Sequence, residues 1–451
     1  MGLRGVGALL GLCLLAACTS YAPQALPTRV SLPASVAAVP VHPAQLPFRQ
    51  LTTHIYNPAD GLDGDEVAML AVANNPQLRA ARDALGLARA QAFSAGLLPD
   101  PQLDYGADHP TNYVPGGATN SYGTVLTYNV NALLLRSSRK KAAEADVQRV
   151  NNELLWQEWQ VVSQARLLFV RLLAQDEQLR ALEASQSLLA DRYRASQKAL
   201  AQGNATADFA ASDLLALQGV ERQYRDLQRS RLQNRAALNA LLGLAESAEP
   251  QLVDGMPPPT LDIAALQANI PQLLQQRPDI RALQAGYQSQ EEKFRGAVLA
   301  QFPALNVGLT RARDNTGIDS IGFAISLSLP IFNRNRGNIA IAQASRKQLY
   351  DEYQARLNSA YSEIALALQN IPLLQVQLER AEHGATSLHG LAQQASSAYQ
   401  TGNLTAPDYV RIQTALLNKQ TEAINLREIL AEQRIALETL LGPNLPERSK
   451  L

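Results

Sequence analysis

The chain has 451 residues, with 40 basic and 40 acidic side chains and a formal net charge of zero. No block of a single charge sign is present, which argues against nucleic acid as a partner. Aromatic residues make up only 5% of the chain, while Ala, Leu and Gln are abundant. This composition suits long packed helices better than a compact enzyme core.

The N-terminus is typical of a secreted lipoprotein. Arg4 precedes an apolar run over 6–16 that is too short to cross a bilayer as a helix, so 1–17 is interpreted as a signal peptide. The run ends in Leu15-Ala16-Ala17-Cys18, which resembles a bacterial lipobox and predicts lipidation of Cys18. A plain signal peptide with a chance cysteine is the alternative. Residue 19 is not the Asp that favours inner-membrane retention in such lipoproteins, so we expect an anchor in the bacterial outer membrane.

The remaining chain contains two copies of one unit. Asn-Pro-Gln-Leu-Arg at 75–79 recurs as Arg-Pro-Asp-Ile-Arg at 277–281, and Leu-Leu-Gly at 241–243 recurs at 440–442. Such matched landmarks predict an internal tandem duplication. The predicted organisation after the signal is a lipidated, proline-punctuated tether (18–60), a first strand–helix repeat (61–245), a linker (246–262), a second repeat (263–443) and a tail (444–451).

Each unit has the same predicted elements. A helix leads into two strands, a very long helix, a Gly-Asn turn and a second long helix. The first helices are expected at 65–96 and 271–300. The strands are expected at 101–109, 121–131, 304–312 and 320–330.

The stretch 320–330 alternates strictly between large apolar residues and small or polar ones. Ile321, Phe323 and Ile325 are separated by Gly322 and Ala324. This period of two indicates a strand, and ten residues is the length that a tilted strand needs to cross a bilayer. We predict a membrane-barrel strand with lipid on the apolar side and water on the other. An ordinary sandwich strand is the alternative, and the other alternating segments count against it.

The long helices carry apolar residues at heptad spacing, which predicts antiparallel coiled-coil packing. No Gly or Pro interrupts 137–202, so this helix would be about 100 Å long. Pro372 interrupts the second copy and predicts a kink or a change of packing.

Four membrane strands cannot close a barrel, because the smallest single-chain barrels need eight. An open edge in lipid leaves backbone groups unpaired at a cost of several kcal/mol each. Two copies would give eight strands with a filled bore, whereas three copies give twelve and leave a channel. The predicted fold is therefore mainly α with a membrane β section: a trimeric α-helical barrel continued by a 12-stranded β-barrel.

In these features the chain resembles the outer-membrane efflux proteins, the TolC-like family. The resemblance is carried by the duplicated unit, by Ala-Gly-Leu-Leu-Pro-Asp-Pro at 95–101 and by Leu-Pro-Ile-Phe-Asn-Arg-Asn-Arg-Gly at 329–337. The second motif looks most like the branch that serves heavy-metal cation efflux of the cobalt–zinc–cadmium type. The resemblance implies a homotrimer that passes substrate from an inner-membrane pump, through a periplasmic adaptor, to the exterior. Drugs or a secreted polypeptide are alternative cargoes, because the pump chooses the cargo.

Two glycine turns end the long helices of the two units. Gly203-Asn204 and Gly402-Asn403 are explained structurally as helix C-caps. The resemblance also implies that both turns lie at the periplasmic tip and meet the adaptor, with Leu404 as an exposed apolar contact.

Asp408, near the start of the last helix, has two interpretations. It is favoured at a helix N-terminus by the helix dipole. The resemblance implies instead an acidic ring of three copies at a closed periplasmic mouth, which would attract cations. The family's second acidic position is occupied here by Arg411, and Asp208 near the first turn is a weaker gate candidate.

Catalytic motifs are missing from the sequence. It contains no nucleophile elbow, Cys/His pair, phosphate loop or zinc motif, and its five histidines lack i,i+3 or i,i+4 spacing. We therefore predict no enzyme activity, no cofactor and no metal site. A periplasmic coiled-coil adaptor or structural lipoprotein remains an alternative of another class, although such proteins lack four alternating strands.

Overall fold

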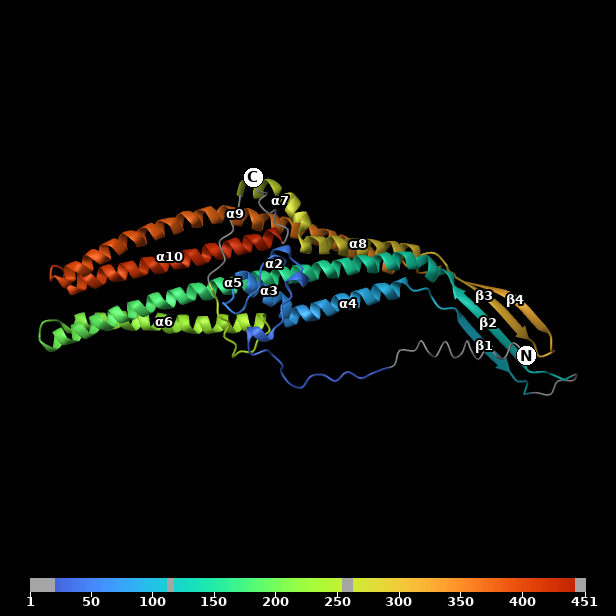
Figure 1. Cartoon of the computed structure of the whole chain (residues 1–451). Coiled ribbons are helices and arrows are strands. Elements are labelled where there is room, and N and C mark those ends of the chain that lie inside the picture. The colour runs from blue at the N-terminus through green and yellow to red at the C-terminus, as the bar shows by residue number, and fades with distance from the viewer. Residues whose placement is uncertain (1–20, 112–116, 254–262, 443–451) are drawn as a thin grey trace.

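The computed structural model describes residues 21–111, 117–253 and 263–442. The predicted signal peptide, Cys18, most of the linker's second half and the tail lie outside these residues. The described chain forms an elongated rod with a sheet at one end and two helical hairpins at the other (Figure 1).

The rod is built from four long helices. They are α5 (Val130–Ala201), α6 (Ala207–Leu241), α9 (Arg336–Gln400) and α10 (Ala406–Leu441). α5 has 72 residues and is therefore about 100 Å long. α5 packs against α6, and α9 packs against α10, each pair as an antiparallel hairpin (Figure 1). Pro372 lies inside α9, which continues through it as one arched helix.

Two shorter helices stand where each unit was predicted to begin with one. They are α3 (Gly64–Asn74) with α4 (Pro76–Gly96), and α7 (Ile263–Gln276) with α8 (Pro278–Leu299). The breaks fall at Asn75 and Arg277, whose ψ angles are 124° and 134°. Each precedes a proline, which disfavours helical geometry in the residue before it. The prediction of a single helix was therefore wrong in both units.

The sheet has four antiparallel strands in the order β1-β2-β3-β4. They are β1 (Gln102–Asp108), β2 (Ser121–Asn129), β3 (Ala304–Arg313) and β4 (Asp319–Ser328). Each strand matches its predicted range to within two residues at either end. β1 and β4 are the edges, and neither edge has a partner within the described residues.

The strand register separates the side chains into two faces. Leu309 is opposite both Leu126 and Phe323, and Val307 is opposite Ile325. Directly opposed residues of antiparallel strands share a face, so these residues form one apolar face. The other, small-residue face contains Gly308, Ala324, Thr310 and Gly322 among others. A Cβ on Gly322 would lie 2.8 Å from the Thr310 hydroxyl oxygen, so this face excludes larger side chains there.

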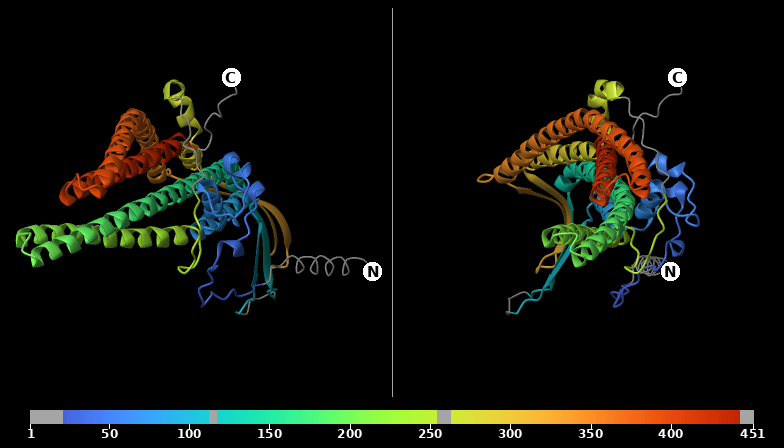
Figure 2. Two further views of the ribbon diagram at one scale, coloured as in Figure 1. Left: turned by 60° about the vertical axis from the view of Figure 1, so that its left-hand side comes forward. Right: turned by 90° about the vertical axis from the view of Figure 1, so that its left-hand side faces the viewer.

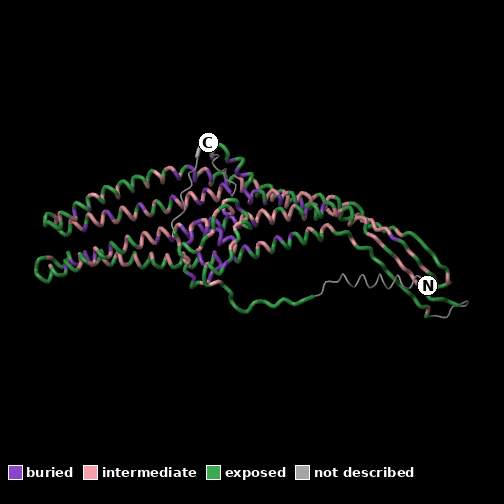
Figure 3. The backbone as a smooth tube through the Cα atoms, in the orientation of Figure 1, coloured by how far each residue is buried: buried purple, intermediate pink, exposed green. Residues whose placement is uncertain are grey.

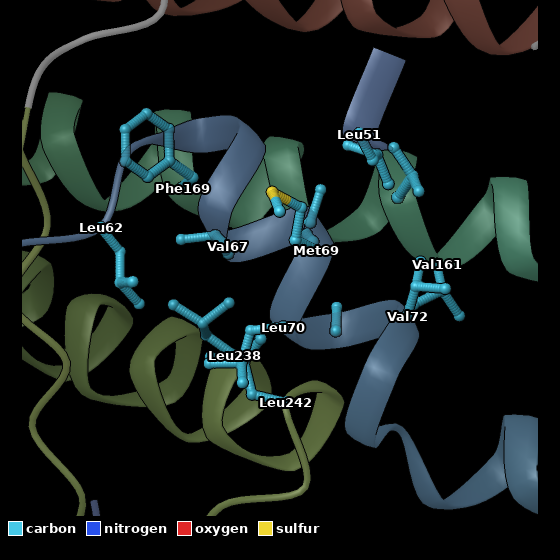
Figure 4. Close-up of a cluster of buried hydrophobic side chains, with 14 of the residues drawn as sticks. Leu51, Leu62, Val67, Met69, Leu70, Val72, Val161, Phe169, Leu238 and Leu242 are labelled. Atoms are coloured by element: carbon cyan, nitrogen blue, oxygen red, sulfur yellow. The ribbon is translucent and has the colours of Figure 1, made fainter. Parts of the chain in front are cut away.

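The hydrophobic core lies at the middle of the rod, where the purple segments concentrate in Figure 3. α3 is buried along almost its whole length and packs between α5 and α6 (Figure 4). Met69 and Leu70 of α3 are fully buried together with Phe169 and Leu238. This burial on all sides explains why the sequence of α3 is apolar without a polar stripe.

The N-terminal segment is only partly an extended tether. Residues 21–32 are exposed in nearly every position. From Pro33 the chain packs on the core: the Pro33 carbonyl accepts from the Ala245 amide at 2.9 Å. Phe48 packs edge-on against Trp159 with ring centroids 5.1 Å apart, and Leu51 is fully buried. Prolines therefore mark turns in a docked segment here, which the prediction of a tether up to residue 60 missed.

None of the helices in the described ranges combines the length and apolarity needed to cross a membrane.

Candidate functional site

The two hairpin tips share one local geometry. Gly203 and Gly402 adopt φ angles of 74° and 75°, in the left-handed region that glycine occupies without strain. The Asn204 amide donates to the Ala199 carbonyl at 2.8 Å, and the Asn403 amide donates to the Ala398 carbonyl at 2.8 Å. These are six-to-one bonds of the Schellman type, which satisfy the last carbonyls of α5 and α9. The turns are therefore fully explained as C-caps.

Asp408 occupies the first turn of α10 and has two partners. Its Oδ2 accepts from the Thr405 hydroxyl at 2.7 Å, while the Thr405 oxygen accepts from the Asp408 amide at 3.4 Å. Its Oδ1 accepts from Arg411 Nη2 at 3.0 Å. The Asp408 side chain keeps 44% of its surface exposed. Arg411 therefore offsets the charge of Asp408 within one protomer.

Asp208 and Leu404 differ from Asp408 in their surroundings. Asp208 is exposed in the first turn of α6, and no ion pair joins it to any residue that the structure describes. Leu404 is half-buried rather than exposed, because it follows the turn where α10 folds back against α9. Beside it, Tyr399 and Tyr409 stack with their ring centroids 4.9 Å apart and hold the two helices together.

A buried ion pair near the α5–α6 tip was not predicted. Arg192 Nε lies 2.7 Å from Asp213 Oδ1, and the Asp213 side chain is only 3% exposed. The Arg192 guanidinium also lies 5.7 Å from the centre of the Phe209 ring. No sequence pattern indicates this pair, because the two residues are 21 positions apart on helices whose relative register is set only by packing.

A row of polar contacts joins the two hairpins along α5 and α10. Arg166 Nη1 lies 3.0 Å from Glu438 Oε2, and Arg171 pairs with Glu432. Farther toward the tips, Gln178 Nε2 donates to Asn425 Oδ1 at 2.7 Å. We call these residues, with Glu428, the polar ladder.

Beyond the polar ladder the hairpins separate toward their tips (Figures 1 and 2). A cavity of about 660 Å³ opens at this point. It is lined by all four long helices, with Ala181 and Leu182 from α5, Val220 from α6, Arg380 from α9 and Leu426 from α10. Each hairpin therefore projects with few contacts to the other over its final turns.

Burial sets the protonation behaviour of the ladder. It raises the pKa of Glu438 above the usual value of 4.5, and Arg166 opposes this shift. Burial also raises the pKa of Glu428, and the neighbouring Glu432 adds to the effect. Glu428 and Glu438 lose hydration when the hairpins pack, and this lost hydration is the main cause of both upward pKa shifts.

The repeated sequence landmarks meet in space in both units. Asn75 Nδ2 donates to the Leu241 carbonyl at 2.9 Å, and Arg277 Nη1 donates to the Leu440 carbonyl at 2.8 Å. Each contact joins the start of a short helix to the end of a long one. Gly243 follows the first of these ends with φ of 64°, and a Cβ there would lie 2.8 Å from the Asn74 carbonyl oxygen.

Arg277 is fully buried and anchors the second joint. It lies 2.8 Å from Asp279 Oδ2, and its guanidinium is 4.9 Å from the Trp156 ring centre. Burial acts to raise the pKa of Asp279, but Arg277 and Arg356 outweigh it and hold that pKa below its usual range. Because Trp156 belongs to α5, this joint also holds the two units together.

Comparison with known proteins agrees with this architecture. Residues 269–443 match the sequence model of the family described as outer membrane efflux protein. This match covers 175 of the 451 residues and lies in the second unit. The cation efflux system protein CusC of Escherichia coli is 26% identical over 194 residues, which cover 41% of this chain and 42% of that protein. The cobalt-zinc-cadmium resistance protein CzcC of Cupriavidus metallidurans is 23% identical over 386 residues, covering 83% of this chain and 88% of CzcC.

Solved structures of outer-membrane channels share the fold. The CmeC outer membrane channel of Campylobacter jejuni superposes with a TM-score of 0.71 at 18% identity, covering 96% of each chain. This likeness extends over both units, including the first, which the family model does not reach.

Metal-binding potential is limited in the described ranges, where no group of three or more His, Cys, Asp or Glu side chains is placed to hold an ion.

Proposed function

We propose that the protein is the outer-membrane duct of a tripartite efflux system and acts as a homotrimer. The observation that carries this proposal is the sheet, whose two edges are unpaired within the described residues. β1 and β4 expose backbone donors and acceptors, which lipid cannot satisfy. Three copies joined edge to edge would give a closed barrel of twelve strands and satisfy every strand.

The two sheet faces support the same assembly. Ile321, Ile325 and Leu327 on the apolar face are between 54% and 84% exposed in one protomer, an arrangement that suits contact with lipid. The small-residue face would line the lumen. Its side chains leave room for an open bore where larger ones would fill it.

The hairpins would extend the duct into the periplasm as a helical barrel. We propose that the tips meet a periplasmic adaptor, through Gly203, Asn204, Gly402 and Asn403 with Leu404 beside them, and that the adaptor connects the duct to an inner-membrane pump. Residues 1–17 would be removed as a signal peptide, and Cys18 would be acylated and anchor the tether in the outer membrane.

Asp408 is the proposed gate residue, with Asp208 as a second candidate at the other tip. Three copies of Asp408 would form a ring at the periplasmic mouth. Since Arg411 pairs with Asp408 in each protomer, we expect a ring of reduced charge that attracts cations weakly.

We propose heavy-metal cations as the cargo. The relatives named for cation efflux and for cobalt-zinc-cadmium resistance support this choice. Deleting the gene and measuring tolerance to zinc, cobalt, copper and drugs tests it. Lost tolerance to metals is expected, whereas lost drug tolerance with unchanged metal tolerance would assign an organic cargo.

The channel itself is tested with purified protein in detergent and in planar bilayers. A trimer that dissociates on heating and conducts ions is expected. A monomer that stays in solution without detergent after its acyl group is removed would contradict the channel and favour a periplasmic adaptor.

A further inference from the structure

The apolar face of the sheet ends in two arginines. Arg311 and Arg313 lie on β3, two and four positions beyond Leu309, at the end of the strand farthest from the helices. The register places Arg311 opposite Thr124 and Ile321, and Arg313 opposite Tyr122 and Asp319. Both arginines therefore share the face of Leu309 rather than the small-residue face.

Neither arginine forms an ion pair within the described parts of the chain. Both are exposed. Asp319 is the one strand carboxylate on this face, and its Oδ1 accepts from the Tyr122 hydroxyl at 3.1 Å. Counted over the strands alone, two positive charges and one negative charge give this end of the face a net charge of +1, and Asp314 lies in the adjoining turn. Asp104 and Asp108 lie on the opposite face, because they pair with Val125 and Ser121, and cannot reach the arginines through the sheet.

Two tyrosines mark the same level of the sheet. Tyr105 is opposite Thr124, and Tyr122 is opposite Arg313. Tyrosine is enriched where a membrane protein crosses from hydrocarbon to head groups. Successive residues on one face are about 6.7 Å apart along a strand, so Arg311 lies one step and Arg313 two steps beyond the apolar level of Leu309 and Phe323. On this spacing we expect the guanidinium groups to reach head-group depth, above Leu309 and Phe323.

We infer that Arg311 and Arg313 bind the phosphate groups of a phosphorylated glycolipid in the outer leaflet of the outer membrane. The inference rests on the proposed function, which places the helices in the periplasm and this end of the sheet outside. Arginine binds phosphate with two parallel N–H donors. Its aliphatic stem can lie along the apolar face while the charged end reaches the head groups. The acyl chains of the same lipid would cover Leu309 and Phe323.

Binding of fluorescent bis-phosphorylated lipid A to the purified, detergent-solubilised trimer tests the site. Fluorescence anisotropy would compare it with dephosphorylated lipid A. The double substitution Arg311→Gln/Arg313→Gln is expected to weaken binding of the phosphorylated lipid about 30-fold and to leave the dephosphorylated lipid unaffected. Asp319→Asn removes the strand carboxylate on this face and keeps both arginines. It is expected to tighten binding of the phosphorylated lipid.

The matched control is Arg222→Gln/Arg225→Gln on α6, which removes the same charge from two exposed arginines far from the sheet. It should bind as the unmodified protein does. If the trimer conducts but the Arg311→Gln/Arg313→Gln variant keeps full affinity for the phosphorylated lipid, the lipid site is refuted and the channel stands. The same holds if the unmodified trimer binds both lipids equally. A protein that neither inserts into bilayers nor conducts overturns the proposed function and the inference together.

Discussion

Replacing Asp213 by Asn should loosen the α5–α6 tip. The substitution keeps the shape of the side chain but removes the negative charge 2.7 Å from Arg192. Breaking a buried ion pair by removing one partner costs about 3–5 kcal/mol. Arg192 keeps 24% of its side chain exposed, so we expect the lower end, about 3 kcal/mol.

This cost should appear locally rather than in the global melting temperature, because the tip projects beyond the polar ladder with few contacts to the other hairpin. Hydrogen exchange of the amides flanking Gly203 is the assay. Local opening that becomes about 3 kcal/mol easier speeds exchange roughly 100-fold. Asp208→Asn is the control, because it removes an equal charge from an exposed residue of the same tip and should stay within about 0.5 kcal/mol. Equal exchange in the two variants would refute the reasoning.

Four further substitutions test other parts of the structure. Glu428→Gln should raise the melting temperature above pH 4.5, the ordinary glutamate pKa, and leave it unchanged in acid. The pKa of Glu428 is raised in the folded state, so the folded protein loses stability when this carboxylate ionises. A higher melting temperature in acid only would contradict this. Gly243→Ala should lower the melting temperature, since its positive φ alone costs about 1–2 kcal/mol and Asn74 blocks the Cβ. Gly219 lies in the middle of α6, where a Cβ would meet no other atom within 4 Å, so Gly219→Ala should stabilise the protein by up to about 1 kcal/mol. Equal effects of the two glycine substitutions would contradict the tight contact between Gly243 and Asn74. Asp408→Ala should weaken the block of single-channel current by multivalent cations, and unchanged block would reject the acidic ring.

Local patterns were sufficient to predict the sheet. Strand period and turn residues depend on near neighbours, so the alternation around Phe323 placed β4 to within two residues. The pairing in the sheet also follows the order of the strands along the chain. The helix breaks at Asn75 and Arg277 also have a local sequence signal, because a proline follows each of these residues.

Contacts between distant helices could not be predicted in the same way. The Arg192–Asp213 pair and the polar ladder depend on how far one helix slides along another, which heptad spacing leaves open in steps of about one turn. The proline-rich composition of 18–60 predicts an extended tether. It does not show that Phe48 has a partner, Trp159, on a helix more than 100 residues away. At the proposed gate, the sequence places Asp408 and Arg411 three positions apart but does not show that they pair.

The pairing of β2 with β3 has a consequence for biogenesis. Asn129 is opposite Asn306, so 177 positions of chain separate residues that become sheet neighbours. Most of the polypeptide must therefore be synthesised before β2 can pair with β3. Until then β1 and β2 alone would be only marginally stable. The four-stranded sheet can therefore be completed only late in folding, after both units of the chain are available.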